Sequence, residues 1–96
     1  MNPSESDHVV RHNRAESRFE SGAEGALALV EYERRGSELV LTHTFVPPAL
    51  RGRGLAEPLV RAALEHARAE KLRVVPACSY AATFIERHAE YQSLLA

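Results

Sequence analysis

The sequence predicts an α+β (mixed α/β) fold, in which a mainly antiparallel sheet carries two main helices packed on it. Two runs of alternating apolar residues, 26–33 and 38–46, flank the short turn sequence RRGS. Apolar residues then recur at helical spacing from about residue 55 to 70, and a short apolar strand and a second helix-like run follow. Antiparallel strands followed by helix, strand and helix are typical of a sheet covered by helices.

Four strands are expected before the first helix. The segments HVVRHN and ESRFES are short strand candidates, and the second ends at SGAEG. The runs 26–33 and 38–46 form a hairpin, because Gly36 permits the turn between them. Pro47 and Pro48 end the second run, since proline donates no backbone hydrogen bond to a sheet. Alternation along that run places one set of side chains on a single face: Leu39, Leu41, His43 and Phe45.

The first helix is expected over residues 55–70. Pro58 fits only in its first turn, where the missing N–H would have no partner within the helix. The segment LRVVPA follows as a short buried strand ended by Pro76. A second helix, residues 79–88, begins with Ser79 as its expected N-cap, and AEYQSLL adds a terminal helical turn.

Length and composition are those of a small one-domain protein. The chain has 96 residues, 45% of them apolar, and its 12 basic and 13 acidic residues give a net charge of -1. Residues 1–7 are polar and expected to be disordered, which leaves residues 8–96 as one domain. A near-zero charge argues against a general nucleic-acid binder, and no apolar run approaches the roughly 20 residues of a membrane span. The N-terminus lacks signal-peptide features and Cys78 is the single cysteine, so we expect a cytoplasmic protein without an internal disulfide.

The stretch VPPALRGRGLAEPLV places Gly52 and Gly54 between the strand end and the helix start. The first N–H groups of a helix have no partner within it, and the helix dipole adds positive partial charge there. Glycine lets the backbone approach a phosphate closely, because it has no Cβ. The stretch is not a Walker loop, since no Gly-Lys-Ser/Thr follows, and its glycine spacing is not that of a dinucleotide fingerprint. Two interpretations remain from the residues alone, a cradle for a phosphate or pyrophosphate and a plain turn with solvated arginines.

The segment RGRGLA matches the Arg/Gln-x-x-Gly-x-Gly/Ala pattern with which the Gcn5-related N-acetyltransferases (GNAT proteins) bind the pyrophosphate of acetyl-CoA. Arg51, Gly54 and Ala56 occupy its fixed positions. With RFE, LVLTHTFVPPALRGRGLAEPLV, KLRVVPACSY and RHAEY, the chain closely resembles the small single-domain GNAT-like proteins of the YjdJ type over roughly residues 9–95. The resemblance implies a truncated GNAT-like fold, because the chain has no room for the helices that build part of the acceptor site in larger members.

The resemblance also implies where acetyl-CoA binds. The main chain of Phe45 and Val46 would bond the pantetheine arm, and Pro47 would leave backbone groups free there. Arg51 or Arg53 could also pair with a phosphate through charge-assisted hydrogen bonds. The backbone that would hold the pyrophosphate comprises Arg51, Gly52, Arg53, Gly54, Leu55 and Ala56.

Two side chains are candidates for the chemistry of acetyl transfer, which needs a deprotonated amine, a polarised thioester carbonyl and a proton for the leaving thiolate. His43 can accept a proton near neutral pH, and its alternative role is that of a hydrogen-bonded histidine in the hairpin. Cys78 precedes the second helix, whose N-terminus favours a thiolate. It would take the acetyl group as a nucleophile or line the thioester pocket, and its alternative role is that of a small buried residue. Tyr80 is expected in the core with Phe84, although its hydroxyl could lie near the ligand.

The expected function is that of an acetyl-CoA-dependent N-acetyltransferase acting on an unidentified primary amine. The alternative is a CoA- or acetyl-CoA-binding module with little or no catalytic activity, because the acceptor-site elements of larger members are missing. A nucleic-acid or interaction domain that uses RGRG is a third interpretation, which the near-neutral charge and the three Tyr and three Phe disfavour. We expect a monomer or weak dimer, with no metal, membrane or nucleic-acid partner.

Overall fold

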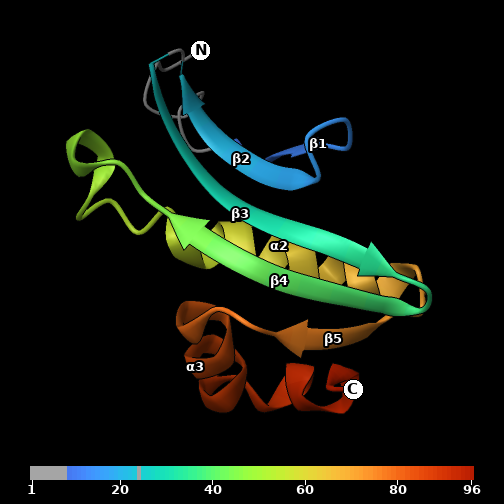
Figure 1. Ribbon diagram of the computed structural model, residues 1–96. Helices are drawn as coiled ribbons and strands as arrows, with labels where there is room; N and C mark the ends of the chain where they lie inside the picture. The colour runs from blue at the N-terminus through green and yellow to red at the C-terminus, as the bar shows by residue number, and fades with distance from the viewer. Residues whose placement is uncertain (1–8, 24) are drawn as a thin grey trace.

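The computed structural model describes residues 9–23 and 25–96 of the chain. Its elements are β1 (Arg11–Asn13), β2 (Arg18–Ala23), β3 (Ala26–Arg35), β4 (Glu38–Phe45), the 3-10 helix η1 (Pro48–Leu50), α2 (Ala56–Ala69), β5 (Arg73–Pro76), α3 (Ser79–Arg87) and the 3-10 helix η2 (Ala89–Leu94). The strands form one sheet in the order β1-β2-β3-β4-β5, and Figure 1 shows α3 and η2 beyond β5. The expected α+β class is confirmed, whereas the segment 1–7, expected to be disordered, lies outside the described residues.

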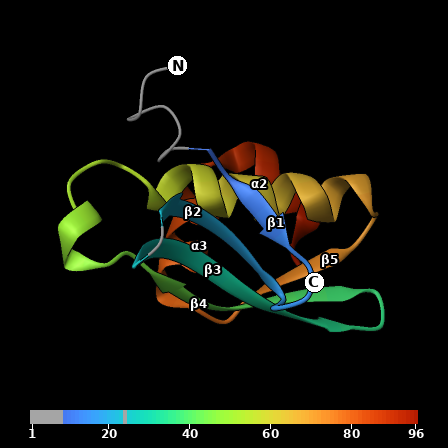
Figure 2. The same cartoon turned by 90° about the horizontal axis from the view of Figure 1, so that it is seen from above.

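β1, β2, β3 and β4 pair with one another in order as antiparallel strands, whereas β4 and β5 pair as parallel strands. A parallel pair needs a crossover that carries the chain back along the sheet, and α2 provides it. Figure 2 shows α2 lying along one face of the sheet. Within the described residues, no helix is long and apolar enough to span a bilayer. The side chains that α2 buries follow the predicted helical spacing: Leu59, Val60, Ala63, Leu64 and Ala67.

The predicted β3–β4 hairpin is confirmed, but it contains a β-bulge. Val30 pairs with Thr44, whereas Tyr32, two residues further along β3, pairs with Leu41. The register therefore shifts between Glu31 and Tyr32, and β4 carries one residue more than β3 across this step. Such an extra residue moves every side chain beyond it to the other face of the strand.

The bulge corrects the face assigned to the end of β4. Leu41 and Thr44 share the face that α2 covers. Their partners on β3, Tyr32 and Val30, are two residues apart, so they lie on one face, and both contribute to the core. His43, which pairs with Glu31, and Phe45 lie on the opposite face, which we call the open face. The prediction that His43 and Phe45 share a face with Leu41 is therefore wrong, because strict alternation assumes a strand with no inserted residue.

α3 follows β5, and its N-cap is Cys78 and not the expected Ser79. The Cys78 Sγ accepts a hydrogen bond from the Ala81 N–H at 3.4 Å, which places the thiol in the role that a hydroxyl usually fills. The predicted terminal helical turn is present as η2. After it, the Ala96 N–H donates to the Val74 oxygen at 3.0 Å, so the end of the chain protects the outer edge of β5.

Two histidines meet between the outer strands and α2. The ring of His12 on β1 lies 4.7 Å from the ring of His66 on α2, and it stacks on Phe19 at 4.1 Å. The His12 Nε2 also lies 2.6 Å from the Tyr32 hydroxyl oxygen. Burial lowers the pKa of both histidines, and the charge of Arg14 lowers the pKa of each of them further.

We expect the protein to lose stability as the pH falls below about 6.5, the ordinary pKa of histidine. The folded pKa values of His12 and His66 lie lower. The unfolded state therefore takes up protons first, and the free energy of unfolding falls until the pH is below the folded values. Urea denaturation at about pH 7.5 and about pH 5.5 measures this loss. His66→Gln should remove about half of it, and His12→Gln should remove a similar share. Equal losses in all three proteins would contradict the assignment.

Candidate functional site

The edge of β4 is free of a β5 partner beyond Leu41. The two strands pair only as far as Leu41 and Pro76, and the chain after Pro76 turns into α3. The Cys78 N–H donates to the Leu41 oxygen at 3.0 Å and holds this turn in place. β4 itself continues to Phe45, and Figure 1 shows its arrow extending beyond that of β5. We call residues 42–46 the β4 edge. An extended ligand can bond a free strand edge of this kind through its own amide groups.

Thr44 and Cys78 meet where the two chain segments separate. The Thr44 Oγ1 and the Cys78 Sγ lie 3.1 Å apart, within hydrogen-bond distance. Cys78 is half-buried and packs against the hydrophobic core, so its thiol lies at the inner end of the β4 edge. The sequence analysis did not find Thr44, because alternation placed its side chain on the face opposite Leu41 and the sequence carries no signal for the bulge.

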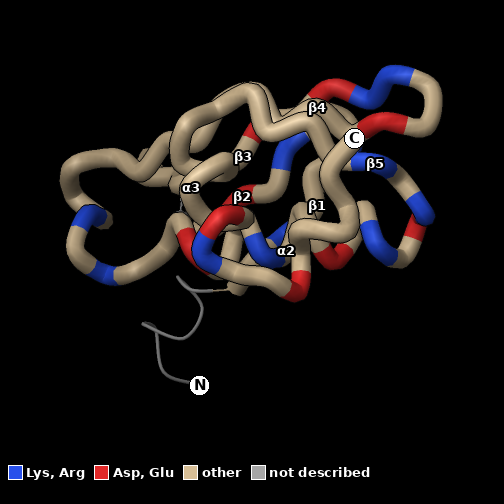
Figure 3. The backbone as a smooth tube through the Cα atoms, turned by 90° about the horizontal axis from the view of Figure 1, so that it is seen from below, with Lys and Arg blue, Asp and Glu red and all other residues tan. Residues whose placement is uncertain are grey.

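The loop between β4 and α2 presents backbone donors and positive charge. Gly52 and Gly54 have φ angles of 83° and 68°, which glycine adopts without strain. α2 follows Leu55, and no side chain caps its first N–H groups, so these are available to an anion. The sequence of this loop contains Arg51 and Arg53 and no acidic residue. Figure 3 shows basic positions in blue on it.

An open hollow beside the loop gathers most of the residues predicted to bind the cofactor. Leu55 is only 2% exposed, so its contribution to the hollow is backbone. Phe45, which is 41% exposed, does not line the hollow: its side chain lies on the open face, and its backbone belongs to the β4 edge. The predicted residues that line the hollow are Val46, Arg51, Gly52, Gly54, Leu55 and Ala56.

Arg51 connects the β4 edge with the loop. Its Nε donates a hydrogen bond to the Val46 carbonyl oxygen at 3.0 Å. That carbonyl is one of the groups expected to bond a pantetheine arm, and its second lone pair can accept from an extended ligand while the arginine stays bound. A guanidinium has five N–H donors, and those that remain can reach a phosphate in the adjacent hollow.

Tyr80 lines the same hollow from the first turn of α3. Its side chain is 42% exposed, so the expectation that it belongs to the core is wrong, whereas Phe84, one turn later, is buried as predicted. Partial burial and the nearby carboxylate of Glu57 raise the pKa of the Tyr80 hydroxyl. The hydroxyl therefore stays protonated near neutral pH and can donate a hydrogen bond.

His43 does not meet Cys78. The His43 ring lies on the open face, where it stacks against Phe45 at 6.3 Å, while Cys78 contacts Thr44, whose side chain lies on the face that α2 covers. The two predicted catalytic residues are therefore separated by the sheet. Among the described residues, the hydrogen-bond partners of the Cys78 thiol are Thr44 and the Ala81 N–H, and neither is a base.

The site thus has two chemically different ends. At the outer end, glycine backbone, an uncapped helix start and arginine side chains suit a doubly charged pyrophosphate. At the inner end, a thiol and a hydroxyl border the core. The β4 edge runs between them, which suits an extended ligand with phosphates at one end and a small apolar group at the other.

Comparisons with known proteins agree with this geometry. The profile of the GCN5-related N-acetyl-transferase family matches residues 18–94. The chain is 38% identical to protein NATD1 of Bos taurus over 82 residues, which covers 82% of this chain and 73% of that protein. Protein NATD1 of Xenopus tropicalis is 35% identical over 91 residues, with 92% of this chain and 83% of that protein covered.

A solved structure has the same fold. A GCN5-like protein from Staphylococcus aureus, determined by NMR in solution, superposes with a TM-score of 0.76 at 30% identity, and the alignment covers 95% of this chain and 90% of that one. Acetyl-CoA is the general acetyl donor of this family. The chain belongs to the GCN5-related N-acetyl-transferase family.

Proposed function

We propose that the chain binds acetyl-CoA along the β4 edge and transfers the acetyl group to a primary amine, as a single-domain member of the YjdJ type spanning residues 8–96. The observation that carries this proposal is the continuity of the site. The free edge of β4 leads from the Thr44–Cys78 contact to Val46, and the Arg51–Val46 hydrogen bond links it to the glycine loop. A pantetheine arm fits the edge and a pyrophosphate fits the loop.

The reaction needs only alignment of two reactants. The amine nitrogen attacks the thioester carbonyl carbon, a C–N bond forms, and the C–S bond breaks. The amine gives up a proton, and the CoA thiolate takes one. Because an aligned amine and thioester react directly, the chain needs no covalent intermediate. We propose that Cys78 lines the thioester pocket and that Thr44 fixes its rotamer through the 3.1 Å contact.

The mass of the protein after exposure to acetyl-CoA distinguishes a nucleophilic Cys78 from a Cys78 that only lines the pocket. We expect no stoichiometric acetyl adduct on Cys78 after exposure to acetyl-CoA without an acceptor, and we expect Cys78→Ala to keep much of the activity, because direct transfer does not pass through the thiol. Intact-protein mass spectrometry is the measurement, with Cys78→Ser as the matched variant. A protein that is one acetyl group heavier, with the group on Cys78 and discharged by added amine, would establish a nucleophile instead.

A CoA-binding module without catalysis is the second candidate, and the position of His43 favours it. The described residues bring no histidine or carboxylate to the Cys78 thiol, and His43 faces the other side of the sheet. Release of free CoA thiol from acetyl-CoA, measured with a panel of polyamines, peptide N-termini and lysine peptides, separates the two. Turnover that depends on one class of amine supports the transferase, and binding without turnover for every class supports the module.

A further inference from the structure

A hollow separate from the β4 edge lies between the end of β5, α3 and the C-terminal part of the chain. Its volume is about 330 Å³, within the range of about 300–1,000 Å³ that is typical of small-molecule pockets. We call it the α3 hollow. Its lining residues are Pro76, Ala82, Ile85, Glu86, Gln92 and Leu95.

Most of the wall of the α3 hollow is apolar. Pro76, Ala82, Ile85 and Leu95 line it with hydrocarbon side chains. Ile85 belongs to the hydrophobic core, whereas Leu95 is 39% exposed, so apolar surface at this site is in contact with water. Covering that surface with the methylene groups of a ligand is favourable.

The polar groups of the α3 hollow are hydrogen-bond acceptors. The Gln92 Nε2 donates to the Ile85 oxygen at 3.4 Å and to the Glu86 oxygen at 3.3 Å. Because both bonds use the amide nitrogen, the amide oxygen of Gln92 can accept from a ligand. The Glu86 carboxylate is exposed and forms no hydrogen bond or ion pair with any residue that the structure describes.

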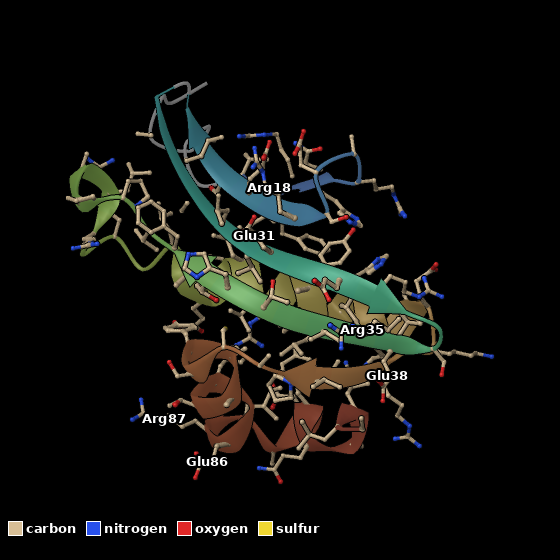
Figure 4. All side chains as sticks on the ribbon, in the orientation of Figure 1. Arg18, Glu31, Arg35, Glu38, Glu86 and Arg87 are labelled. Carbon is tan, nitrogen blue, oxygen red and sulfur yellow. The ribbon has the colours of Figure 1, made fainter. Side chains whose placement is uncertain are left out.

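The charge of the α3 hollow is negative. Among the residues that the structure describes, no lysine, arginine or histidine lines it, and Arg73 and Arg87 line other hollows. Figure 4 shows the side chains of Glu86 and Arg87 leaving α3 in different directions. The C-terminal end of α3 adds negative partial charge. An ammonium group on an aliphatic chain complements these acceptors and these apolar walls.

A short turn connects the α3 hollow with the inner end of the β4 edge. Pro76 lines the hollow, Cys78 borders the β4 edge, and Ala77 between them is exposed. The Ala82 N–H donates to the Cys78 oxygen at 3.1 Å, which fixes the wall of the hollow to this turn. A flexible chain of methylene groups that is anchored in the hollow can therefore extend across the turn toward the site of the thioester.

We propose that the α3 hollow binds one ammonium group of a linear aliphatic diamine whose other amine is the acetyl acceptor. The inference rests on the proposed function and names its substrate class. The second amine, in its deprotonated form, attacks the thioester carbonyl carbon; a C–N bond forms and the C–S bond breaks. The attacking nitrogen loses a proton, and the CoA thiolate takes one. A lysine side chain carries a single amine, so it cannot fill the hollow and react at the same time.

Binding to the α3 hollow can be measured without acetyl-CoA, from the amide chemical shifts of the labelled full chain. Hexanediamine and hexylamine should both shift the signals of Ala82, Glu86 and Leu95, with a Kd of about 1 mM. Hexanol, which carries no charge, should bind about fivefold more weakly. Glu86→Gln should weaken both amines about fivefold, as the loss of one exposed ion pair predicts.

Glu70→Gln is the matched control, because Glu70 is an exposed carboxylate at the end of α2 that does not line the α3 hollow. It should leave the affinity for both amines unchanged. Absence of shifts at the hollow with either amine, or equal affinities in Glu86→Gln and wild type, overturns the ammonium site and leaves the proposed function standing.

Release of CoA thiol from acetyl-CoA tests the acceptor assignment. The wild-type kcat/KM for hexanediamine should exceed that for hexylamine about fivefold, and Glu86→Gln should lower only the value for hexanediamine. Equal values for the two amines in the wild-type protein overturn the acceptor assignment while the transferase stands. Shifts at the α3 hollow without acetyl transfer to any amine overturn the proposed function, and the acceptor role with it.

Discussion

Gly54→Ala is expected to lower the affinity for CoA at least about tenfold, because a methyl group would stand where the pyrophosphate approaches the helix start. Gly54 lines the hollow, and a Cβ at this position would meet no protein atom within 4 Å. The free protein therefore has space for the methyl group, and its cost should appear mainly on binding. Calorimetry with CoA gives the affinity, and urea denaturation gives the stability of the variant.

Gly36→Ala is the matched control for this effect. Gly36 has a φ of 59°, close to the 68° of Gly54, and a Cβ there also meets nothing within 4 Å, but it lies in the β3–β4 turn. Both variants should lose about 1 kcal/mol of stability from the left-handed backbone, and only Gly54→Ala should lose CoA affinity. Equal CoA affinities for the two variants would place the pyrophosphate elsewhere.

Gly22→Ala is expected to cost the largest amount of stability, about 3 kcal/mol or more. A Cβ on Gly22 would clash with the carbonyl oxygen of Ala26 and approach Leu50 Cδ1 to 3.2 Å. The backbone carbonyl belongs to the neighbouring strand and cannot move without disturbing the β2–β3 ladder. The free energy of unfolding from chemical denaturation measures this cost.

Gly25→Ala separates the clash from the backbone strain. Gly25 also has a positive φ, 84°, but a Cβ there meets nothing within 4 Å. It should lose only about 1 kcal/mol. If Gly22→Ala were no less stable than Gly25→Ala, the assignment of a steric clash between residue 22 and the Ala26 carbonyl would be contradicted.

Local patterns predicted most of the fold. The hairpin follows from two alternating runs around Gly36, and the long helix follows from apolar spacing with Pro58 in its first turn. These signals are local, because strand alternation and helical spacing are set by backbone geometry within one element. The Gly52–Gly54 loop was likewise predictable, since glycine just before a helix start carries its own physical reason.

The inner end of the site could not be predicted in the same way. The bulge belongs to the register between β3 and β4. Because of it, the His43 side chain lies on the face away from Cys78, and the Thr44 side chain contacts the Cys78 thiol. Cys78 became the N-cap in place of Ser79, because its N–H bond to Leu41 on β4 sets where α3 begins. Both outcomes depend on how segments far apart in the sequence pair with each other. The local residue pattern of one segment carries no signal for that pairing.

Titration of the isotope-labelled protein with acetyl-CoA, followed by the amide chemical shifts, tests most directly whether the cofactor occupies the β4 edge and the loop. We expect the largest shifts at residues 44–46, at residues 51–57 and at Cys78, with small shifts in β1 and in the β3–β4 turn around Gly36. The Val46 and Arg51 signals should change together, because the ligand would bind beside the hydrogen bond that joins these two residues. Shifts confined to other parts of the chain, or no shifts at saturating acetyl-CoA, would contradict the proposed site.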